Sequence, residues 1–286
     1  MFASLAIAAS VAASGPATMA EWHAACDGKE EWTGPGPPLH VHGSSYYVGT
    51  CTISVILITS PKGHILLDGG MAGSAPSVAA NIERLGFKLS DVRLIGASHE
   101  HNDHSGAIAE LQKMTGAAVM AMPSAFNALE TGQVEKEDPQ FGLPNSYPGS
   151  KVGIILFDGL PLRAGPIPIT AYATPGHAPG STSWTWRSCE AKRCVQIVYA
   201  DSVSAVSADN YRFSDNGRYV ADFRRSLRAI GRLKCDLLIT PHPSASEFIE
   251  RMDGKQPLVG PGQCADYARR GAAALDARLA KEAAAK

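Results

Sequence analysis

The chain has 286 residues, 45% of them hydrophobic, and a formal net charge of −1. This length fits one large domain or two small ones, and the apolar fraction is sufficient for a sizeable core. A balanced charge, with a pI near 6.7, gives no electrostatic case for nucleic acid or an anionic membrane, so we expect neither as a partner.

The first twenty residues are small and apolar, and the first charged side chain is Glu21. This composition is typical of the hydrophobic region of a signal peptide that ends at a small-residue cleavage site near Ala20. We therefore predict a signal peptide over residues 1–20, export to the periplasm, and a single domain over residues 21–286. The segment lacks a basic beginning, and a disordered tail is the alternative.

Strand-like and helix-like patterns alternate along the rest of the chain, after an extended arm predicted for Glu21 to Pro38. The periodicity and the turn residues predict strands over 39–49, 52–59, 64–67, 92–97, 119–122, 167–172, 184–186, 195–199 and 237–239. Helices are predicted over 78–85, 107–114, 123–129, 218–233 and 264–280. The polar segment from Glu130 to Lys151 is long enough for a functional loop.

One stretch carries a dense set of metal-binding side chains, in the pattern H-x-H-x-D-H from His99 to His104. It lies between a predicted strand and a predicted helix, and on extended backbone His99 and His101 point to the same side. Four ligands in six residues are difficult to fit around one tetrahedral ion, but they can divide between two. Imidazole and carboxylate ligands suit Zn²⁺.

Two further histidines follow predicted strands. His177 lies in the turn Thr174-Pro175-Gly176-His177, and His242 lies in Thr240-Pro241-His242-Pro243. Either histidine alone would be an ordinary loop residue. Together with the first motif, both are predicted to be metal ligands.

These motifs resemble those of the metallo-β-lactamase superfamily and, within it, subclass B3. The resemblance also rests on Asp68-Gly69-Gly70 and on Tyr199-Ala200-Asp201-Ser202-Val203-Ser204, and it runs from about residue 40 to the last helix. It implies an α/β fold, the αββα sandwich, in which helices cover the outer faces of two mixed β-sheets. It also implies a small-molecule β-lactam as the substrate; we expect a monomer.

The resemblance implies the roles of the ligands as well. Two zinc ions per chain are expected, one held by His99, His101 and His177 and the other by Asp103, His104 and His242. A zinc-bound hydroxide would attack the β-lactam amide of penicillins, cephalosporins and carbapenems, which gives antibiotic resistance. Asp103 and His177 are the predicted catalytic residues, and Asp103 would orient the nucleophile.

Other residues are predicted around the metal ions. Asp68 either fixes a ligand imidazole from behind or only forms a turn before two glycines. The hydroxyls of Ser202 and Ser204 are expected to bind the substrate carboxylate, unless they only cap a turn. The remaining predicted substrate contacts are Gln140, Tyr46 and Tyr211.

Two alternatives to a β-lactamase remain. The first is a thioesterase or lactonase of the same superfamily, similar to hydroxyacylglutathione hydrolases, in which Asp201 would bridge the two metal ions. The second is a zinc-binding module without catalysis. Structural zinc is normally enclosed by four protein ligands, whereas each set here has three.

Six cysteines agree with an exported protein. Cys189 and Cys194 flank a hairpin-like turn, across which a disulfide forms easily. Cys235 and Cys264 match the disulfide positions of the subclass, which leaves Cys26 to pair with Cys51. Reduced thiols in a cytosolic protein are the alternative.

Overall fold

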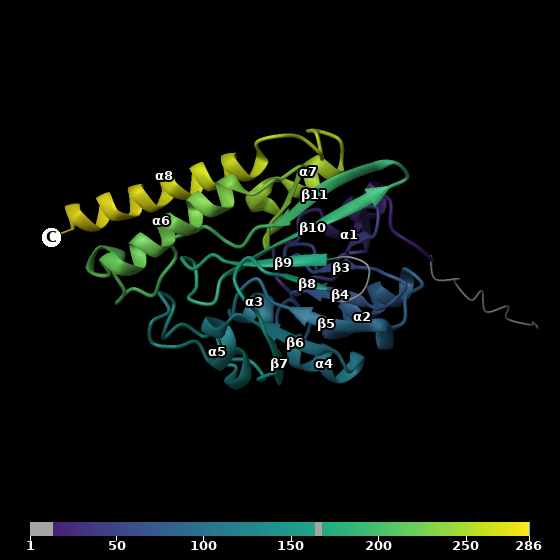
Figure 1. The fold of residues 1–286 in the computed structure, drawn as a ribbon, viewed down its shortest axis with the longest axis horizontal. Helices are drawn as coiled ribbons and strands as arrows, with labels where there is room; N and C mark the ends of the chain where they lie inside the picture. Colours follow the sequence, from purple (N-terminus) through teal and green to yellow (C-terminus); the bar gives the residue numbers. More distant parts are fainter. Residues whose placement is uncertain (1–13, 164–167, 286) are drawn as a thin grey trace, which may run out of the picture.

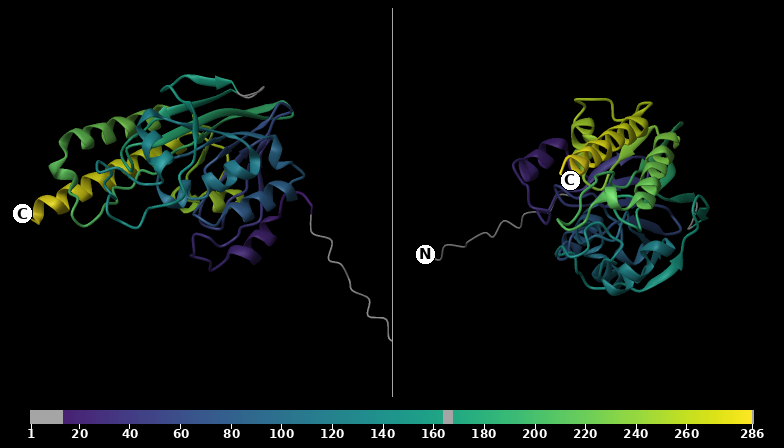
Figure 2. Two further views of the ribbon diagram at one scale, coloured as in Figure 1. Left: turned by 90° about the horizontal axis from the view of Figure 1, so that it is seen from below. Right: turned by 90° about the vertical axis from the view of Figure 1, so that its left-hand side faces the viewer.

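The structure is a computed structural model that describes residues 14–163 and 168–285. Residues 1–13 of the predicted signal peptide lie outside the described residues. Two β-sheets pack face to face, and helices cover their outer faces (Figures 1 and 2). This arrangement confirms the predicted αββα sandwich.

The first sheet has seven strands that follow one another in space as they do in the sequence. They are β1 (Leu39–His42), β2 (Ser45–Tyr47), β3 (Ile56–Ile58), β4 (His64–Leu67), β5 (Val92–Gly96), β6 (Ala118–Ala121) and β7 (Val152–Ile155). Pairing is antiparallel from β1 to β4 and parallel from β4 to β7. The strand predicted over 39–49 is two strands, because Gly43 takes a φ of 54° at the turn between them.

The second sheet has five strands in the order β12-β11-β10-β9-β8. They are β8 (Pro161–Arg163), β9 (Pro168–Ala173), β10 (Thr182–Glu190), β11 (Arg193–Tyr199) and β12 (Leu237–Ile239). Only β11 and β12 run parallel. Strands β7 and β8 were not predicted from the sequence.

Helices form the two outer layers. α2 (Ala75–Arg84), α4 (Ile108–Thr115) and α5 (Phe126–Thr131) pack on the seven-stranded sheet. α6 (Gly217–Arg232) and α8 (Gln263–Ala284) pack on the five-stranded sheet. The shorter elements are α1 (Met19–Cys26), η1 (Leu89–Asp91), α3 (Asn102–Ser105), η2 (Pro123–Ala125), η3 (Phe213–Asp215), η4 (Pro243–Ser246) and α7 (Phe248–Met252).

Strand residues alternate between two hydrophobic layers, because successive side chains point to opposite faces of a sheet. Ile56 and Ile58 pack between the sheets, whereas Leu57 between them packs under the helices. Ile197 faces inward and Val198 faces α6 and α8 in the same way. Each fully buried side chain of this size contributes about 1.5–3 kcal/mol, so both faces of each sheet hold the sandwich together.

The beginning of the described chain corrects one prediction. Residues 19–26 form helix α1 rather than an extended arm. Thr18 caps the helix, since its hydroxyl accepts a hydrogen bond from the Glu21 amide and the Glu21 carboxylate accepts one from the Thr18 amide. Trp22 is buried against Tyr47. A chain that began at Glu21 would therefore lack the cap of this helix.

The three predicted disulfides are confirmed: Cys26–Cys51, Cys189–Cys194 and Cys235–Cys264. In the part of the chain that the structure describes, no helix has the length and hydrophobicity that a transmembrane span requires.

The disulfides should contribute unequally to the free energy of unfolding. In the chain-entropy account, a bridge between residues 29 apart in sequence stabilises the fold by about 1.5 kcal/mol more than one between residues 5 apart. Replacing Cys235 and Cys264 together with Ala should therefore cost more than replacing Cys189 and Cys194, as measured by urea unfolding of oxidised protein. Equal losses would contradict this ranking.

Candidate metal centre

The candidate site lies where the strands of both sheets end. Asp68 follows β4 and Ser98 follows β5, and these strands are parallel neighbours in the first sheet. Asp201 and His242 follow β11 and β12, which are parallel neighbours in the second. Since the carboxyl ends of parallel neighbours meet at one edge, each sheet brings its polar residues to the same side of the sandwich.

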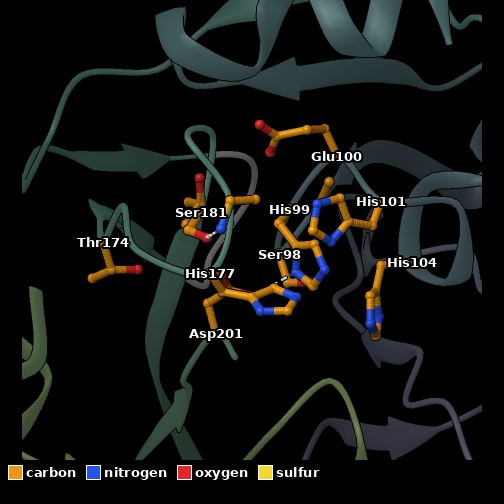
Figure 3. A network of polar contacts seen from close by, with 12 residues as sticks. Ser98, His99, Glu100, His101, His104, Thr174, His177, Ser181 and Asp201 are labelled. Carbon is orange, nitrogen blue, oxygen red and sulfur yellow. Dashed lines mark hydrogen bonds and ion pairs between the residues drawn. The ribbon is translucent and has the colours of Figure 1, made fainter. Parts of the chain in front are cut away.

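The H-x-H segment has the predicted conformation. His101 is extended, with φ −76° and ψ 154°, and helix α3 begins directly after it. The imidazoles of His99 and His101 therefore share one side, and the Glu100 carboxylate points away from them (Figure 3). Glu100 is buried and accepts a hydrogen bond of 2.7 Å from the Gly180 amide. Burial raises the pKa of its carboxyl to about 7.

His99, His101 and His177 form the first set of ligand atoms. One nitrogen of each ring lies within 4.8 Å of the others, and the ring centroids are 4.7–4.9 Å apart. All three side chains are buried. Figure 3 shows the three rings converging from two separate segments of the chain.

Asp103, His104 and His242 form the second set. Asp103 Oδ2 lies 3.0 Å from His104 Nε2 and 3.2 Å from His242 Nε2. The two imidazole nitrogens are 3.3 Å apart. The structure thus brings all six predicted ligands to one edge of the sandwich, in two adjacent sets.

The outer nitrogen of each ring in the first set has a partner. His99 Nδ1 lies 2.8 Å from Asp201 Oδ1, and His101 Nε2 lies 2.9 Å from Asp138 Oδ2. His177 Nδ1 lies 3.0 Å from the Ser204 carbonyl. These partners fix the tautomer and the orientation of the rings. They leave Nε2 of His99, Nδ1 of His101 and Nε2 of His177 facing the centre of the set.

Asp68 has several partners at the junction of the two sheets. It accepts hydrogen bonds from the Ser98 amide and hydroxyl at 2.5 and 2.8 Å, and from the Tyr199 hydroxyl at 2.6 Å. Its Oδ2 lies 3.4 Å from His104 Nδ1, a contact without hydrogen-bond geometry. Its φ of 65° also makes it a turn residue. Asp68 is therefore both a turn residue and a neighbour of the His104 ring, so both of its predicted roles are consistent with the structure.

The electrostatics suit binding of a cation. Burial, followed by the neighbouring imidazoles, holds the pKa of His99 well below its usual value, and burial also lowers the pKa of His177 to about 3. Both rings are therefore neutral, as ligands must be. Burial opposes ionisation of Asp103, yet the adjacent histidines hold its pKa below the usual range. Asp103 in turn raises the pKa of His104 to about 10 against the effect of burial, so His104 must release a proton when it binds a metal ion.

The donor set also fits a metal ion. Nε2 of His99 is fully buried and has no hydrogen-bond partner among the described residues, which costs free energy unless another group binds there. Imidazole nitrogens and carboxylate oxygens are donors that divalent metal ions accept. Because each set supplies three protein ligands, each ion would keep an open position.

Two of the predicted substrate contacts, Ser204 and Gln140, lie beside this centre. Ser204 Oγ is 3.0 Å from His177 Nδ1, so its hydroxyl touches the outer side of a ligand ring. Ser202 is half-buried in the irregular segment after β11. Gln140 reaches over the centre from the long loop, and its Nε2 lies 3.5 Å from His177 Nε2.

The two predicted tyrosines lie elsewhere. Tyr46 alternates with Tyr47 on β2, and because Tyr47 faces the space between the sheets, Tyr46 faces the helices and packs against His40 and Phe87. The prediction that Tyr46 contacts the substrate is therefore wrong, because the register of β2 turns its side chain toward the helices. Tyr211 packs against Phe213 and Tyr219 and lines a cavity of about 640 Å³ with residues of the long loop.

The sequence reasoning missed three residues of this site. Asp138 is buried in the long loop and contacts His101. Trp32 has 47% of its surface exposed, and its ring centroid is 5.8 Å from that of His242. Glu100 lies within the motif itself, and only the alternation of side chains on extended backbone could have indicated its supporting role.

Comparisons with known proteins agree with this geometry. A family model described as the metallo-beta-lactamase superfamily matches residues 48–190. The crystal structure of MIM-1, a metallo-β-lactamase from Novosphingobium pentaromativorans, is 48% identical with a TM-score of 0.90, covering 92% of this chain and 98% of that one. MEM-A1, a subclass B3 metallo-β-lactamase from a soil metagenome library, is 42% identical with a TM-score of 0.86, covering 90% and 100%. A probable metallo-hydrolase of Burkholderia pseudomallei (strain 1710b) is 25% identical over 237 residues, covering 78% and 71%.

The chain therefore belongs to the metallo-β-lactamase superfamily. Within the superfamily, the predicted resemblance to subclass B3 is confirmed, because chains of that subclass match nearly the whole described fold.

Asp138 provides a test of the first ligand set. Replacing Asp138 with Ala should weaken Zn²⁺ binding by about 10–100-fold, since His101 would lose the carboxylate that orients its ring. The adjacent and exposed Glu137 is a matched control: Glu137→Ala should leave the affinity unchanged in a chelator competition assay. Equal zinc affinity in both variants would show that the contact with Asp138 is not needed.

Proposed function

We propose that this chain hydrolyses the amide bond of β-lactams with two zinc ions, as a class B β-lactamase that confers antibiotic resistance. The main evidence for this proposal is that two adjacent sets of three candidate ligands lie at one edge of the sandwich. The similarity of the whole fold to metallo-β-lactamases at 42–48% identity supports the same conclusion.

The proposed ligands of one ion are His99, His101 and His177. Those of the other are Asp103, His104 and His242. When bound, a pair of zinc ions supplies Lewis acidity toward a carbonyl oxygen and lowers the pKa of water to about 7. The protein contributes the fixed geometry of the donors and the open side of each set.

Asp103 has a second proposed role in the reaction. Its pKa is held low by the adjacent imidazoles, so its carboxylate stays ionised and can accept a hydrogen bond from the attacking water. A water oriented in this way can reach the carbonyl carbon of the strained amide, and the same carboxylate can take its proton. Asp201 and Asp138 act indirectly, because they keep His99 and His101 in place.

The substrate carboxylate would be bound beside His177, which both Ser204 and Gln140 contact. Ser202, Ser204 and Gln140 provide neutral donors there, and no Lys or Arg lies within residues 201–207. These hydroxyl and amide groups can bind a carboxylate through charge-assisted hydrogen bonds.

The position of Asp201 argues against the thioesterase or lactonase alternative. In that alternative Asp201 would bridge both metal ions. Its Oδ1 instead lies 2.8 Å from His99 Nδ1, on the side of the ring that faces away from the other ligands. A carboxylate behind a ligand ring orients that ring but cannot bridge the ions.

The location and the oligomeric state are part of the same proposal. Three disulfides fit an oxidising compartment, and together with the apolar leader they support export to the periplasm. We propose that the enzyme acts there as a monomer on a small-molecule substrate.

Activity should depend on the metal and favour β-lactams. We expect purified protein to hydrolyse a penicillin, a cephalosporin and a carbapenem. A chelator should abolish turnover and added Zn²⁺ should restore it, because the six ligands supply no nucleophile of their own. Turnover by a metal-free sample, or much faster cleavage of lactoylglutathione than of any β-lactam, would overturn the proposal.

Ser204 should matter for substrate binding. Replacing Ser204 with Ala removes one hydroxyl but keeps the backbone carbonyl that also contacts His177. Loss of a hydrogen bond to a charged group should raise KM roughly tenfold with a smaller effect on kcat, while the zinc content stays unchanged.

Ser207 offers a control, because its hydroxyl bonds to the Ala208 carbonyl. Ser207→Ala should leave KM unchanged. If Ser202→Ala combined with Ser204→Ala also leaves KM unchanged for every β-lactam, the carboxylate is bound elsewhere.

A further inference from the structure

Helix α6 carries an unusual concentration of positive charge. It contains five arginines and one aspartate, whereas the whole chain has a net charge of −1. Arg224, Arg228 and Arg232 follow one another at intervals of four residues, so they form one row along the helix. Like charges at this spacing repel one another, and a bound anion would relieve this repulsion.

This row borders a groove between α6 and α8. The two helices lie side by side on the outer face of the second sheet (Figures 1 and 2). The groove has a volume of about 330 Å³, which lies at the lower end of the range for small-molecule sites. Its apolar wall consists of Leu227, Gly231, Ala265, Ala268 and Ala272, and its charged wall consists of Arg224, Arg228, Arg232 and Arg269.

The arginines of the groove differ in their partners. Arg224 pairs with Asp276 at 2.5 Å, and Arg269 pairs with Asp266. Arg228 and Arg232 form neither an ion pair nor a hydrogen bond with any residue that the structure describes, and both are exposed. Two guanidinium groups are thus free to bind an anion at the edge of an apolar surface.

We propose that this groove binds a single-chain anionic amphiphile, with a phosphate-type head group on Arg228 and Arg232 and an alkyl tail along the alanines of α8. Guanidinium groups bind phosphate oxygens in pairs. The tail would cover the apolar wall and remove it from water. A bare anion would leave this wall exposed, and a neutral amphiphile would leave both arginines unpaired.

The groove is separate from the candidate metal centre. α6 packs beneath the segment that leads to His177, since the Ser226 hydroxyl bonds to the Pro175 carbonyl and Phe223 lies against Gly176. The arginine row occupies a different side of the same helix. Binding of a molecule in the groove therefore involves none of the candidate metal ligands. Substitutions in the arginine row test this binding independently of the proposed hydrolysis.

The test is calorimetric titration of the zinc-loaded enzyme with decyl phosphate at low ionic strength, below the micelle concentration. Arg228→Gln combined with Arg232→Gln should weaken binding at least tenfold. Arg218→Gln combined with Arg225→Gln removes the same charge from α6 without touching the groove, and it should change the affinity less than twofold. Equal losses in the two double variants would overturn the proposal, since they would mean general electrostatic attraction.

A second arm tests the apolar wall. Ala272→Met places a larger side chain in the groove at a half-buried position and should also weaken binding of decyl phosphate at least tenfold, with unchanged thermal unfolding. Inorganic phosphate and decyl maltoside should each bind at least tenfold more weakly than decyl phosphate. Binding of inorganic phosphate as tight as that of decyl phosphate would exclude an amphiphile site.

Discussion

The contact between His99 and Asp201 joins the two sheets at the edge where the ligands gather. His99 follows β5 of the first sheet and Asp201 follows β11 of the second, and the fully buried pair is 2.8 Å apart. Tyr199 and Asp68 join the same two sheets beside it at 2.6 Å. Leaving a buried hydrogen-bonding group without its partner typically costs about 1–3 kcal/mol. The sheets therefore cannot slide at this edge without leaving polar groups unpaired, and these contacts hold the candidate metal centre rigid.

The residues between the ligands give the centre further support. Glu100 separates two ligand histidines in the sequence, and its carboxylate binds the Gly180 amide behind them. A Cβ at position 180 would lie 2.4 Å from Glu100 Oε2, so only glycine allows this close approach. The turn that carries His177 is thus fixed to the segment that carries His99 and His101. The segment from His99 to His101 therefore supplies two candidate ligands and, through Glu100, the contact that positions the ring of His177.

The sequence predicted which six side chains come together, because each follows an apolar strand and parallel neighbours end at one edge. It did not predict Asp138, because a polar loop has no periodicity that would place one of its carboxylates behind His101. Tyr46 was assigned to the cleft although the register of β2 turns it toward the helices. Helix α1 was missed because it depends on the burial of Trp22 against Tyr47, a contact distant in sequence. Local pattern therefore predicted most of the elements and the grouping of the candidate ligands, while pairing register and long-range packing decided the rest.

The proposed hydrolysis depends on two ions, each bound by its own set of three side chains. Anomalous X-ray diffraction at the zinc edge from crystals of the zinc-loaded enzyme tests it most directly. Two peaks are expected, one within bonding distance of the inner nitrogens of His99, His101 and His177, and one beside Asp103, His104 and His242. A single peak, or a zinc ion bound by the carboxylate of Asp201, would show that the proposed arrangement of ions is wrong.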